Sequence, residues 1–518
     1  MADITKGVRA FTIGTAISRV FGLVRESVFA YLYGAGRSTD AFVAAFRIPN
    51  LLRDLFAETA LSAAFVPVLT AERQKSKEQQ NLLASNVFNI LIITVGVIVV
   101  LGIVLAPYLV KILAFGFGNI PNKQALTASL TVVMFPFLLF VALAAWAMGY
   151  LNTEREFFVP SAAPAFFNIV SFAVPLFSFA YLVRTGTDPI YAMAYGVLIG
   201  GLTQFIIQVP FLFTKGFHYH LYVNFKDPKL RAILTLFVPV ALGLAASRIN
   251  VAVDTLLISF LEERSMTWLN YAFRIMHLPL GLFGVAVGTV ALPAISQYVT
   301  EKKFDAARAT LFDSLQLVFF LTVTTSIIIA FLGFPITRLI YERGRFTPFD
   351  TYATTQALML YIIGVPFIAG IRNVAAVFYA YRDAKTPMYA SFFAVGLHVV
   401  MSLGLMRVIG FRAFPLATTV ASFTNLAILM HQLPKKIGSF EISPLVDYFV
   451  RLVIASIIGG FAGILLTKLF TALLGVSLSA QILGLGLSGF AALAICYAAC
   501  ILLGVTEARD YIKRLFRR

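Results

Sequence analysis

The stretch SRVFGLVRES, residues 18–27, places Arg19, Arg25 and Glu26 inside an otherwise apolar segment that runs from about Val8 to Tyr33. Similar apolar segments of about 20 residues recur along the whole chain. The 518-residue sequence is 59% hydrophobic and 13% charged. A soluble protein carries about 25% charged residues, so this composition excludes a large soluble helical protein. The sequence therefore predicts an all-α polytopic membrane protein whose first segment is a permanent span rather than a cleaved signal peptide.

We expect fourteen transmembrane helices, with the eighth centred near residue 285 and the last two after residue 445. An even number of spans places both termini on the same side of the membrane. Roughly 23 Lys and Arg residues fall on that side and roughly 10 on the other, which predicts that both termini are cytoplasmic. The same asymmetry explains much of the net charge of +17, so nucleic acid is not an expected partner. The basic tail from about Arg509 is expected to act as a plain positive-inside signal, with contact to anionic membrane lipids as the alternative.

An internal repeat relates two parts of the chain at an offset of about 226 residues. The segment ISRVFGLVRESVF (17–29) aligns with ASRINVAVDTLLI (246–258), and VAAFRIPN (43–50) aligns with LNYAFRIMH (269–277). A repeat of six helices predicts two parallel-related lobes around a central cavity, with the substrate site near the membrane midplane. The expected divisions are an N-lobe at 1–225, a C-lobe at 226–440, and two further helices with a basic tail at 441–518.

Charged residues inside the predicted spans concentrate in the first two spans of each half. A charge at the bilayer centre costs about 3 kcal/mol, so such residues usually face a cavity or a partner. Arginines outnumber acids and no lysine belongs to the set, and arginine binds phosphate and carboxylate in a bidentate manner. The cavity is therefore predicted to bind an anion, such as a phosphate or pyrophosphate. The set comprises Arg19, Arg25, Arg47, Arg53, Arg248, Arg274, Arg372, Glu26, Asp40, Asp54, Glu58 and Asp254.

The alternative is that these charges form structural salt bridges. Arg25 and Glu26 are adjacent in sequence and are not expected to face each other, so such bridges would join different helices. Arg19 and Glu26 share one helix face, with Arg25 about 120° away. This wide polar face favours a water-filled cavity over a single buried ion pair, although a structural role for any one arginine stays open.

Sequence motifs for other chemistries are absent. No G-x-x-x-x-G-K-[ST] motif occurs, so we expect no ATPase activity, and energy must come from a gradient, the membrane potential or the substrate itself. No histidine lies in a zinc motif, and Cys496 and Cys500 are expected to be small apolar residues. The segment YERGRFTPFD (341–350) is expected to be a solvated external loop. Trp146 and Trp268 are expected near the membrane interfaces.

Several motifs resemble those of the MurJ family, the lipid II flippases of the MOP exporter superfamily. The resemblance implies a protein of the bacterial inner membrane, not an enzyme, that moves lipid II from the inner to the outer leaflet by alternating access. Lipid II is the undecaprenyl-pyrophosphate-linked precursor of peptidoglycan. The resemblance also implies that the last two helices form a groove for the lipid tail. The motifs are SRVFGLVRES (18–27), GAGRSTDAF (34–42), FRIPNLLRDLFAE (46–58), YAFRIMHLPLG (271–281), GRFTPFD (344–350) and AKTP (384–387).

The resemblance assigns roles to individual residues. The expected pyrophosphate ligands are Arg19, Arg25, Arg53 and Arg274. Gating of the cavity or ion pairing is expected of Glu26, Asp40, Arg47 and Glu58.

Some relatives bind sodium between the seventh, eleventh and twelfth spans. Asp254 and Thr418 resemble two of those ligands, so a sodium ion is a candidate cofactor. His398 and Ser402 stand where an Asn and an Asp would be needed, and a hard cation favours carboxylate and carbonyl oxygens.

Three other functions stay open from the sequence. A flippase for another undecaprenyl-linked oligosaccharide would present the same pyrophosphate. A multidrug-type exporter of cations would need a cavity dominated by acids, whereas this one is rich in arginine. A scaffold for cell-wall synthesis enzymes, which are also expected partners of a flippase, would tolerate loss of the cavity arginines.

Overall fold

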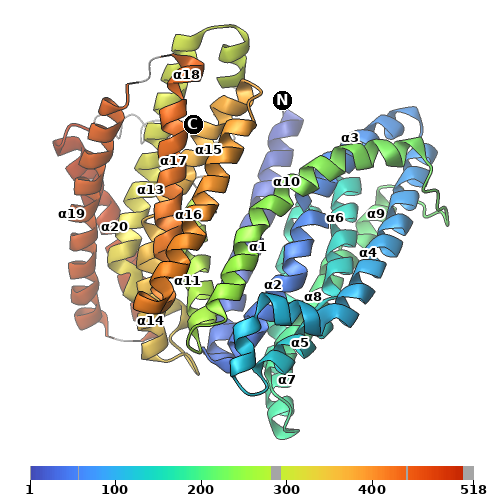
Figure 1. Cartoon of the computed structure of the whole chain (residues 1–518), viewed down its shortest axis with the longest axis horizontal. Helices are drawn as coiled ribbons and strands as arrows, with labels where there is room; N and C mark the ends of the chain where they lie inside the picture. The colour runs from blue at the N-terminus through green and yellow to red at the C-terminus, as the bar shows by residue number, and fades with distance from the viewer. Residues whose placement is uncertain are drawn as a thin grey trace. The chain divides into compact units, whose positions relative to one another are not determined.

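The computed structural model describes residues 2–56, 58–281, 293, 295–438, 441–475 and 477–505, except the side chains of residues 2–8, 54–60, 63, 240 and 242–248. These residues form helices and contain no strand (Figure 1). The all-α architecture predicted from hydropathy is confirmed. The eighth expected span, centred near residue 285, lies outside the described residues, and the count of fourteen spans stays a prediction.

The chain forms two compact units, of which the first comprises Met1–Thr267 and Arg343–Phe346. Its short 3-10 helix is η1 (Phe115–Asn119). Its α-helices are α1 (Ala2–Tyr33), α2 (Arg37–Phe56), α3 (Glu58–Lys75), α4 (Lys77–Leu113), α5 (Lys123–Met134), α6 (Phe137–Thr153), α7 (Phe158–Arg184), α8 (Ile190–Ile206), α9 (Val209–Thr214) and α10 (Pro228–Ile258).

The second unit comprises Trp268–Glu342 and Thr347–Arg518. It contains most of α11 (Ser265–Pro279) and the 3-10 helix η3 (Gly410–Arg412). Its other helices are α13 (Phe304–Tyr341), α14 (Pro348–Ile362), α15 (Val365–Ala380), α16 (Lys385–Ile409), α17 (Ala413–Gln432), α18 (Pro434–Ile437), α19 (Ser443–Leu474) and α20 (Leu478–Leu502). The last two pack side by side, as Figure 1 shows in red.

Nine helical stretches in the described part of the chain are long and apolar enough to cross a membrane. The stretches include α4, α7, α13, α19 and α20. Neither α1 nor α2 is among them, because the charged residues of these helices lower their mean hydropathy. Two helices that carry predicted cavity charges are therefore missed by hydropathy alone, whereas Arg372 lies on α15, in a stretch that is apolar enough.

The positions of helix starts agree with the internal repeat. Helix α4 begins at Lys77 and α13 at Phe304, while α7 begins at Phe158 and α16 at Lys385. Both pairs keep the offset of about 226 residues found in the sequence. The compact units follow packing instead, because α10, which opens the second repeat, contacts α2, α3 and α4. The division at residues 225 and 440 stays a prediction about the repeat.

Both tryptophans are buried inside the protein. Trp146 and Trp268 are each 1% exposed. The indole N–H of Trp146 donates to the Ala84 carbonyl oxygen at 3.0 Å, and that of Trp268 donates to Oδ1 of Asp350 at 2.9 Å. Each indole N–H finds its partner in the protein core, so neither ring forms an exposed aromatic belt, and their depth relative to the membrane interfaces stays a prediction.

The cysteines behave as the sequence predicts. Cys496 and Cys500 are buried on α20. A Cβ at Gly459 on α19 would lie 2.7 Å from Cβ of Cys496, so small residues set the close approach of these two helices.

Candidate functional site

The charged face of α1 is positioned by packing against α7. Gly14, Ser18 and Gly22 recur at every fourth position and therefore share one face of α1. A Cβ at Gly14 would overlap the side chain of Ser161, and Asn168 donates from Nδ2 to the Ser18 carbonyl oxygen at 3.1 Å. Small residues allow the two backbones to approach closely, which fixes the rotation of α1 and hence the direction of its charged side chains.

Arg25 and Glu26 form an ion pair within α1. Nη2 of Arg25 donates to Oε1 of Glu26, and both side chains are buried. The guanidinium also lies 5.5 Å from the ring centroid of Phe167 on α7. The expectation that these neighbours do not pair is wrong, because the long arginine side chain can turn back along the helix surface to the next carboxylate. Glu26 thus offsets the buried charge of Arg25.

The other predicted charges of α1, α2 and α3 differ in exposure. Arg19 is exposed on α1, and Arg53 is half-buried in the last turn of α2. Arg47 is also half-buried on α2 and donates from Nη1 to Oγ1 of Thr255 on α10 at 3.1 Å. The side chain of Glu58 lies outside the described residues. The first unit therefore combines one buried, paired arginine with others that a ligand can reach more easily.

Asp40 is a buried carboxylate that accepts four hydrogen bonds. Oδ2 accepts from Nζ of Lys123 at 3.0 Å and from the backbone nitrogen of Arg264 at 2.8 Å. Oδ1 accepts from the backbone nitrogen and the hydroxyl of Thr267, at 3.0 and 2.6 Å. Because Arg264 and Thr267 lie at the start of α11, Asp40 anchors the beginning of that helix to α2. Its contacts are those of an ion-pairing residue inside the protein.

Lys123 is the partner of Asp40 that sequence reasoning missed. Both side chains are almost completely buried, and Nζ of Lys123 lies 4.2 Å from the ring centroid of Phe117. The signal was present in the sequence, since Lys123 is the only charged residue between Lys111 and Glu154. Removing one partner of a buried pair costs about 3–5 kcal/mol, so this pair constrains the fold strongly.

Arg274 lies in the second unit, on α11. Its neighbours Tyr271, Ile275 and Met276 are buried, whereas Arg274 and His277 are exposed. Helix α11 is therefore amphipathic, with one face packed in the second unit and the other accessible. The remaining predicted pyrophosphate ligands belong to the first unit.

The residues suggested for sodium give little support to a cation site. Thr418 donates its hydroxyl to the Phe414 carbonyl oxygen at 2.9 Å, while His398 and Ser402 are buried and supply no carboxylate. Asp254 is half-buried on α10 in the first unit. Among the described residues, no three His, Cys, Asp or Glu side chains group as metal ligands would. The sodium ion stays a prediction, and no step proposed below depends on it.

Residues Arg343–Phe346 pack within the first unit, although the helices on either side belong to the second. Arg345 donates its backbone N–H to the Tyr31 carbonyl oxygen at 3.0 Å, and its guanidinium lies 5.1 Å from the ring centroid of Phe179. Gly344 has a φ of 59°, and a Cβ there would overlap Tyr31. Only glycine combines this left-handed backbone with such a close approach.

The same segment ends at a buried carboxylate. Asp350 is inaccessible to solvent, forms a capping box with Thr347 at the start of α14, and accepts from Trp268. The prediction of a solvated loop at 341–350 holds for residues 343–345 and 347–349, which are exposed, but not for Tyr341, Phe346 and Asp350, which are buried. The Thr-x-x-Asp spacing was the available signal, because it is typical of a capping box.

Comparisons with known proteins give a consistent result. A family model described as Lipid II flippase MurJ matches residues 29–484. The chain is 33% identical over 509 residues to a probable lipid II flippase MurJ of Vibrio cholerae serotype O1, which covers 96% of this chain and 95% of that one. It is 32% identical over 453 residues to the lipid II flippase MurJ of Burkholderia cenocepacia, with 86% of each chain covered.

Solved structures include two informative neighbours. One is described as lipid II flippase MurJ in an inward closed conformation, with a TM-score of 0.76 and 26% identity over 97% of this chain and 99% of that one. The other is a multidrug resistance MATE family transporter of the MOP superfamily in an inward-facing conformation. It has a TM-score of 0.63 and 12% identity, over 83% of this chain and 98% of that one, and shows a shared fold alone.

Proposed function

This chain belongs to the MurJ lipid II flippase family, and we propose that it carries lipid II from the inner to the outer leaflet of the bacterial cytoplasmic membrane. The observation that carries the proposal is the family match over residues 29–484, supported by arginines on membrane helices of the kind that bind pyrophosphate. The family is one of transporters rather than enzymes, and we infer that this chain makes and breaks no covalent bond.

The pyrophosphate of lipid II is the proposed ligand of the arginines. We propose Arg19, Arg53 and Arg274 as its ligands, since all three are exposed or half-buried. A guanidinium donates two parallel hydrogen bonds to a phosphate, which gives geometric selectivity as well as charge. The exposed face of α11 suits this role because its opposite face is packed in the unit.

Arg25 would enter the cycle by exchanging partners. In the structure it is paired with Glu26 and lies against Phe167. A pyrophosphate carries more negative charge than one carboxylate and can compete for the same guanidinium. Glu26 then keeps the buried arginine compensated before substrate arrives, because an unpaired buried charge would be strongly destabilising.

Asp40 would act on transport as a positioning residue. It binds Lys123 and the backbone at the start of α11, so it holds the helix that carries Arg274. Arg47 similarly joins α2 to α10 through Thr255. We propose no separate role for Glu58, whose side chain is not described.

Transport would proceed by alternating access, with the head group crossing inside the cavity and the lipid tail remaining in the bilayer. Helices α19 and α20 are the proposed groove for the tail. The membrane potential is a sufficient driving force, since moving one charge is worth about 2.3 kcal/mol per 100 mV and an interior-negative potential favours outward movement of an anion. Both termini would be cytoplasmic, where cell-wall synthesis enzymes are further proposed partners.

The test is complementation of cells depleted of their own lipid II flippase. Lipid II at the outer leaflet is measured by its accessibility to a reagent that acts only outside the membrane. Wild type is compared with Arg25→Ala and Arg274→Ala, and Arg184→Ala, at the exposed end of α7, is the matched control. Rescue by wild type and the control, but not by the well-expressed cavity variants, is the expected result.

Two other outcomes would change the proposal. Rescue by every variant would keep the substrate and remove the arginine mechanism. Failure of a correctly folded wild-type protein would redirect the search to other undecaprenyl-linked oligosaccharides.

A further inference from the structure

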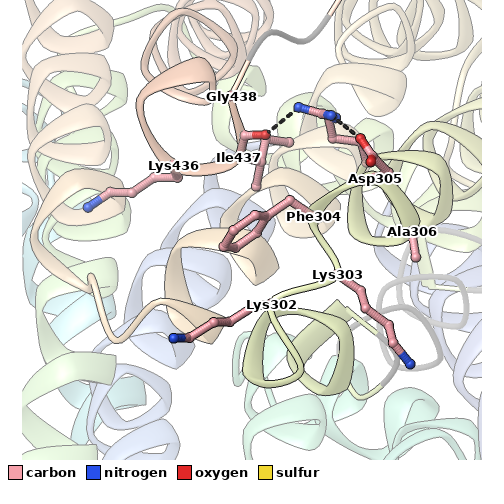
Figure 2. Close-up of a pocket in the computed structure, with 9 residues that line it drawn as sticks. Lys302, Lys303, Phe304, Asp305, Ala306, Lys436, Ile437 and Gly438 are labelled. Atoms are coloured by element: carbon pink, nitrogen blue, oxygen red, sulfur yellow. Dashed lines mark hydrogen bonds and ion pairs between the residues drawn. The ribbon is translucent and has the colours of Figure 1, made fainter.

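A cavity of about 610 Å³ lies at the start of α13 in the second unit, and Arg274 is not among the residues that line it (Figure 2). It is formed where the first turn of α13 meets the end of α18. Four of its nine lining residues are cationic. The nine lining residues are Lys302, Lys303, Phe304, Asp305, Ala306, Arg308, Lys436, Ile437 and Gly438.

Arg308 forms the wall of the cavity and is occupied by that role. Its Nη1 donates to the Ile437 carbonyl oxygen at 2.8 Å, and its Nη2 donates to Oδ1 of Asp305. Gly438 has a φ of 79°, and a Cβ there would lie 2.8 Å from Nη1 of Arg308. These contacts join α13 to α18 and give the cavity a fixed shape.

The lysines are the accessible cations of the cavity. Figure 2 shows Lys302 and Lys436 extending to the same side of Phe304, whereas Lys303 points away. Lys303 pairs with Glu301 at 2.8 Å, and Lys436 pairs with Asp383 at 2.9 Å. Lys302 makes no ion pair with any residue that the structure describes. An ammonium group carries three donors, so both Lys302 and Lys436 retain donors for a ligand.

An apolar surface lies between these two lysines. Phe304 is 41% exposed although it opens a helix, and its ring stacks on Tyr381 with centroids 6.4 Å apart and planes 18° apart. Ile437 adds a buried aliphatic side chain on the α18 side. A site with two cations and an exposed aromatic ring suits a ligand that is anionic at one point and less polar next to it.

We propose that this cavity binds the phosphate group of an anionic ligand, held by Lys302 and Lys436 with Phe304 against its less polar part. The site is separate from the arginines of the proposed transport function and does not depend on them. The phosphate can belong to a phospholipid head group or to a soluble phosphate compound. The alternative is a plain positive-inside signal, in which each lysine acts only through its charge and its position does not matter.

The test measures binding to the purified full-length protein in two arms. In the first arm, the protein is extracted from vesicles of phosphatidylglycerol and phosphatidylcholine, and the phosphatidylglycerol retained per protein is counted by native mass spectrometry. In the second arm, inorganic phosphate is titrated against the protein in phosphatidylcholine nanodiscs and followed by ³¹P line width. The variant is Lys302→Gln with Lys436→Gln. The matched control is Lys385→Gln with Lys435→Gln, two exposed lysines that do not line the cavity.

We expect each cavity lysine to contribute about fivefold in affinity, the equivalent of about 1 kcal/mol for a lysine near an anionic surface. The cavity variant should lose binding and the control should keep it. Lys302→Arg with Lys436→Arg should also keep it, which guards against a folding defect. Loss confined to the first arm identifies a lipid head group, loss confined to the second identifies a soluble phosphate, and loss in both shows that the site accepts the phosphate group from either source. Equal binding by the cavity variant and the control in both arms overturns the proposal.

Discussion

The start of α4 in the first unit and the start of α13 in the second are equivalent in the internal repeat, yet they treat charge in opposite ways. Ser76 precedes α4 and caps it, since its hydroxyl accepts from the backbone nitrogen of Gln79 at 3.1 Å. Lys303 stands at the corresponding place before α13, and no side chain caps that helix. A side chain therefore satisfies a free backbone N–H group at the start of α4. At the start of α13, the positive end of the helix dipole lies next to further cations.

Around α4, the cations are paired with protein carboxylates. Glu154 accepts from Lys77 and Gln80, each at 2.8 Å, and lies 3.1 Å from Arg73. Burial by itself would raise the pKa of Glu154, but the hydrogen bonds from Lys77 and Gln80 outweigh it and hold the pKa below its usual range. Glu72 similarly binds Lys75 and Lys229.

Around α13, Lys302 and Lys436 line a cavity instead, whereas Lys303 points away from them. Lys302 lacks a carboxylate partner among the described residues, and Lys303 pairs only with an acid on the surface, Glu301. The comparison teaches that a repeat can preserve helix starts while its charges diverge. Carboxylates neutralise Lys77 and Arg73 near the start of α4, although a pocket of about 490 Å³ lined by Arg73 and Arg155 also lies there. Near the start of α13, Lys302 stays available to a ligand.

The largest effect expected from internal pairing is in Asp40→Asn. The variant removes the carboxylate partner of buried Lys123, so the free energy of unfolding should fall by about 3–5 kcal/mol. Asp350→Asn is the comparison in the second unit, where Trp268 and Thr347 donate to the carboxylate, and about 1–3 kcal/mol is expected. Denaturant unfolding in detergent measures both.

The double variant Asp40→Asn with Lys123→Met isolates the charge. It should recover part of the lost stability, because no buried cation is then left uncompensated. If the double variant is no more stable than Asp40→Asn, Lys123 is not the reason for the loss.

A smaller loss of stability is expected from Glu154→Gln, since Glu154 pairs with Lys77 at the start of α4. The change weakens the charge-assisted hydrogen bonds from Lys77 and the contact with Arg73, and should cost about 1.5–3 kcal/mol. Glu301→Gln is the matched acid-to-amide change in the second unit, and little loss of stability is expected there because its pair with Lys303 is exposed. Equal shifts in melting temperature for the two variants would contradict the proposed difference in charge pairing between the starts of α4 and α13.

The sequence predicts the helices better than it predicts the pairing of their charges. Hydropathy and the arginine-rich spans are local properties of the chain, so the architecture and the charged helices can be read directly. Lys123 was missed because its partner Asp40 is distant in sequence and only the tertiary fold brings them together. The Arg25–Glu26 pair was missed because a helix-face argument follows Cβ directions and ignores the reach of a long side chain.

The stability contributed by Asp383, which pairs with the cavity residue Lys436, should depend on pH. Hydrogen bonds from Lys436 and Thr386 lower the pKa of Asp383 to about 2. A carboxyl whose pKa is lowered on folding stabilises the protein above its unfolded pKa of about 4, and this contribution is lost as the pH falls towards 2. The difference in melting temperature between wild type and Asp383→Asn should therefore be largest above pH 5 and shrink on acidification. A difference that is constant with pH would contradict the ionised pair.

The smallest effect comes from giving α13 the cap that α4 already has. Lys303→Ser places a hydroxyl at the N-cap and removes a cation from the positive end of the helix. Lys303→Ala is the control, because it removes the same cation without adding an acceptor. The Lys303→Ser variant should be more stable than Lys303→Ala by about 1 kcal/mol in the free energy of unfolding.

Because Lys303 points away from Lys302 and Lys436, both variants should retain the phosphate binding proposed for the cavity. If Lys303→Ser stabilises the helix and binding is kept, the cap and the cations have diverged independently between the starts of α4 and α13. If either variant abolishes binding, Lys303 belongs to the ligand site, and phosphate binding at the start of α13 then depends on all three lysines.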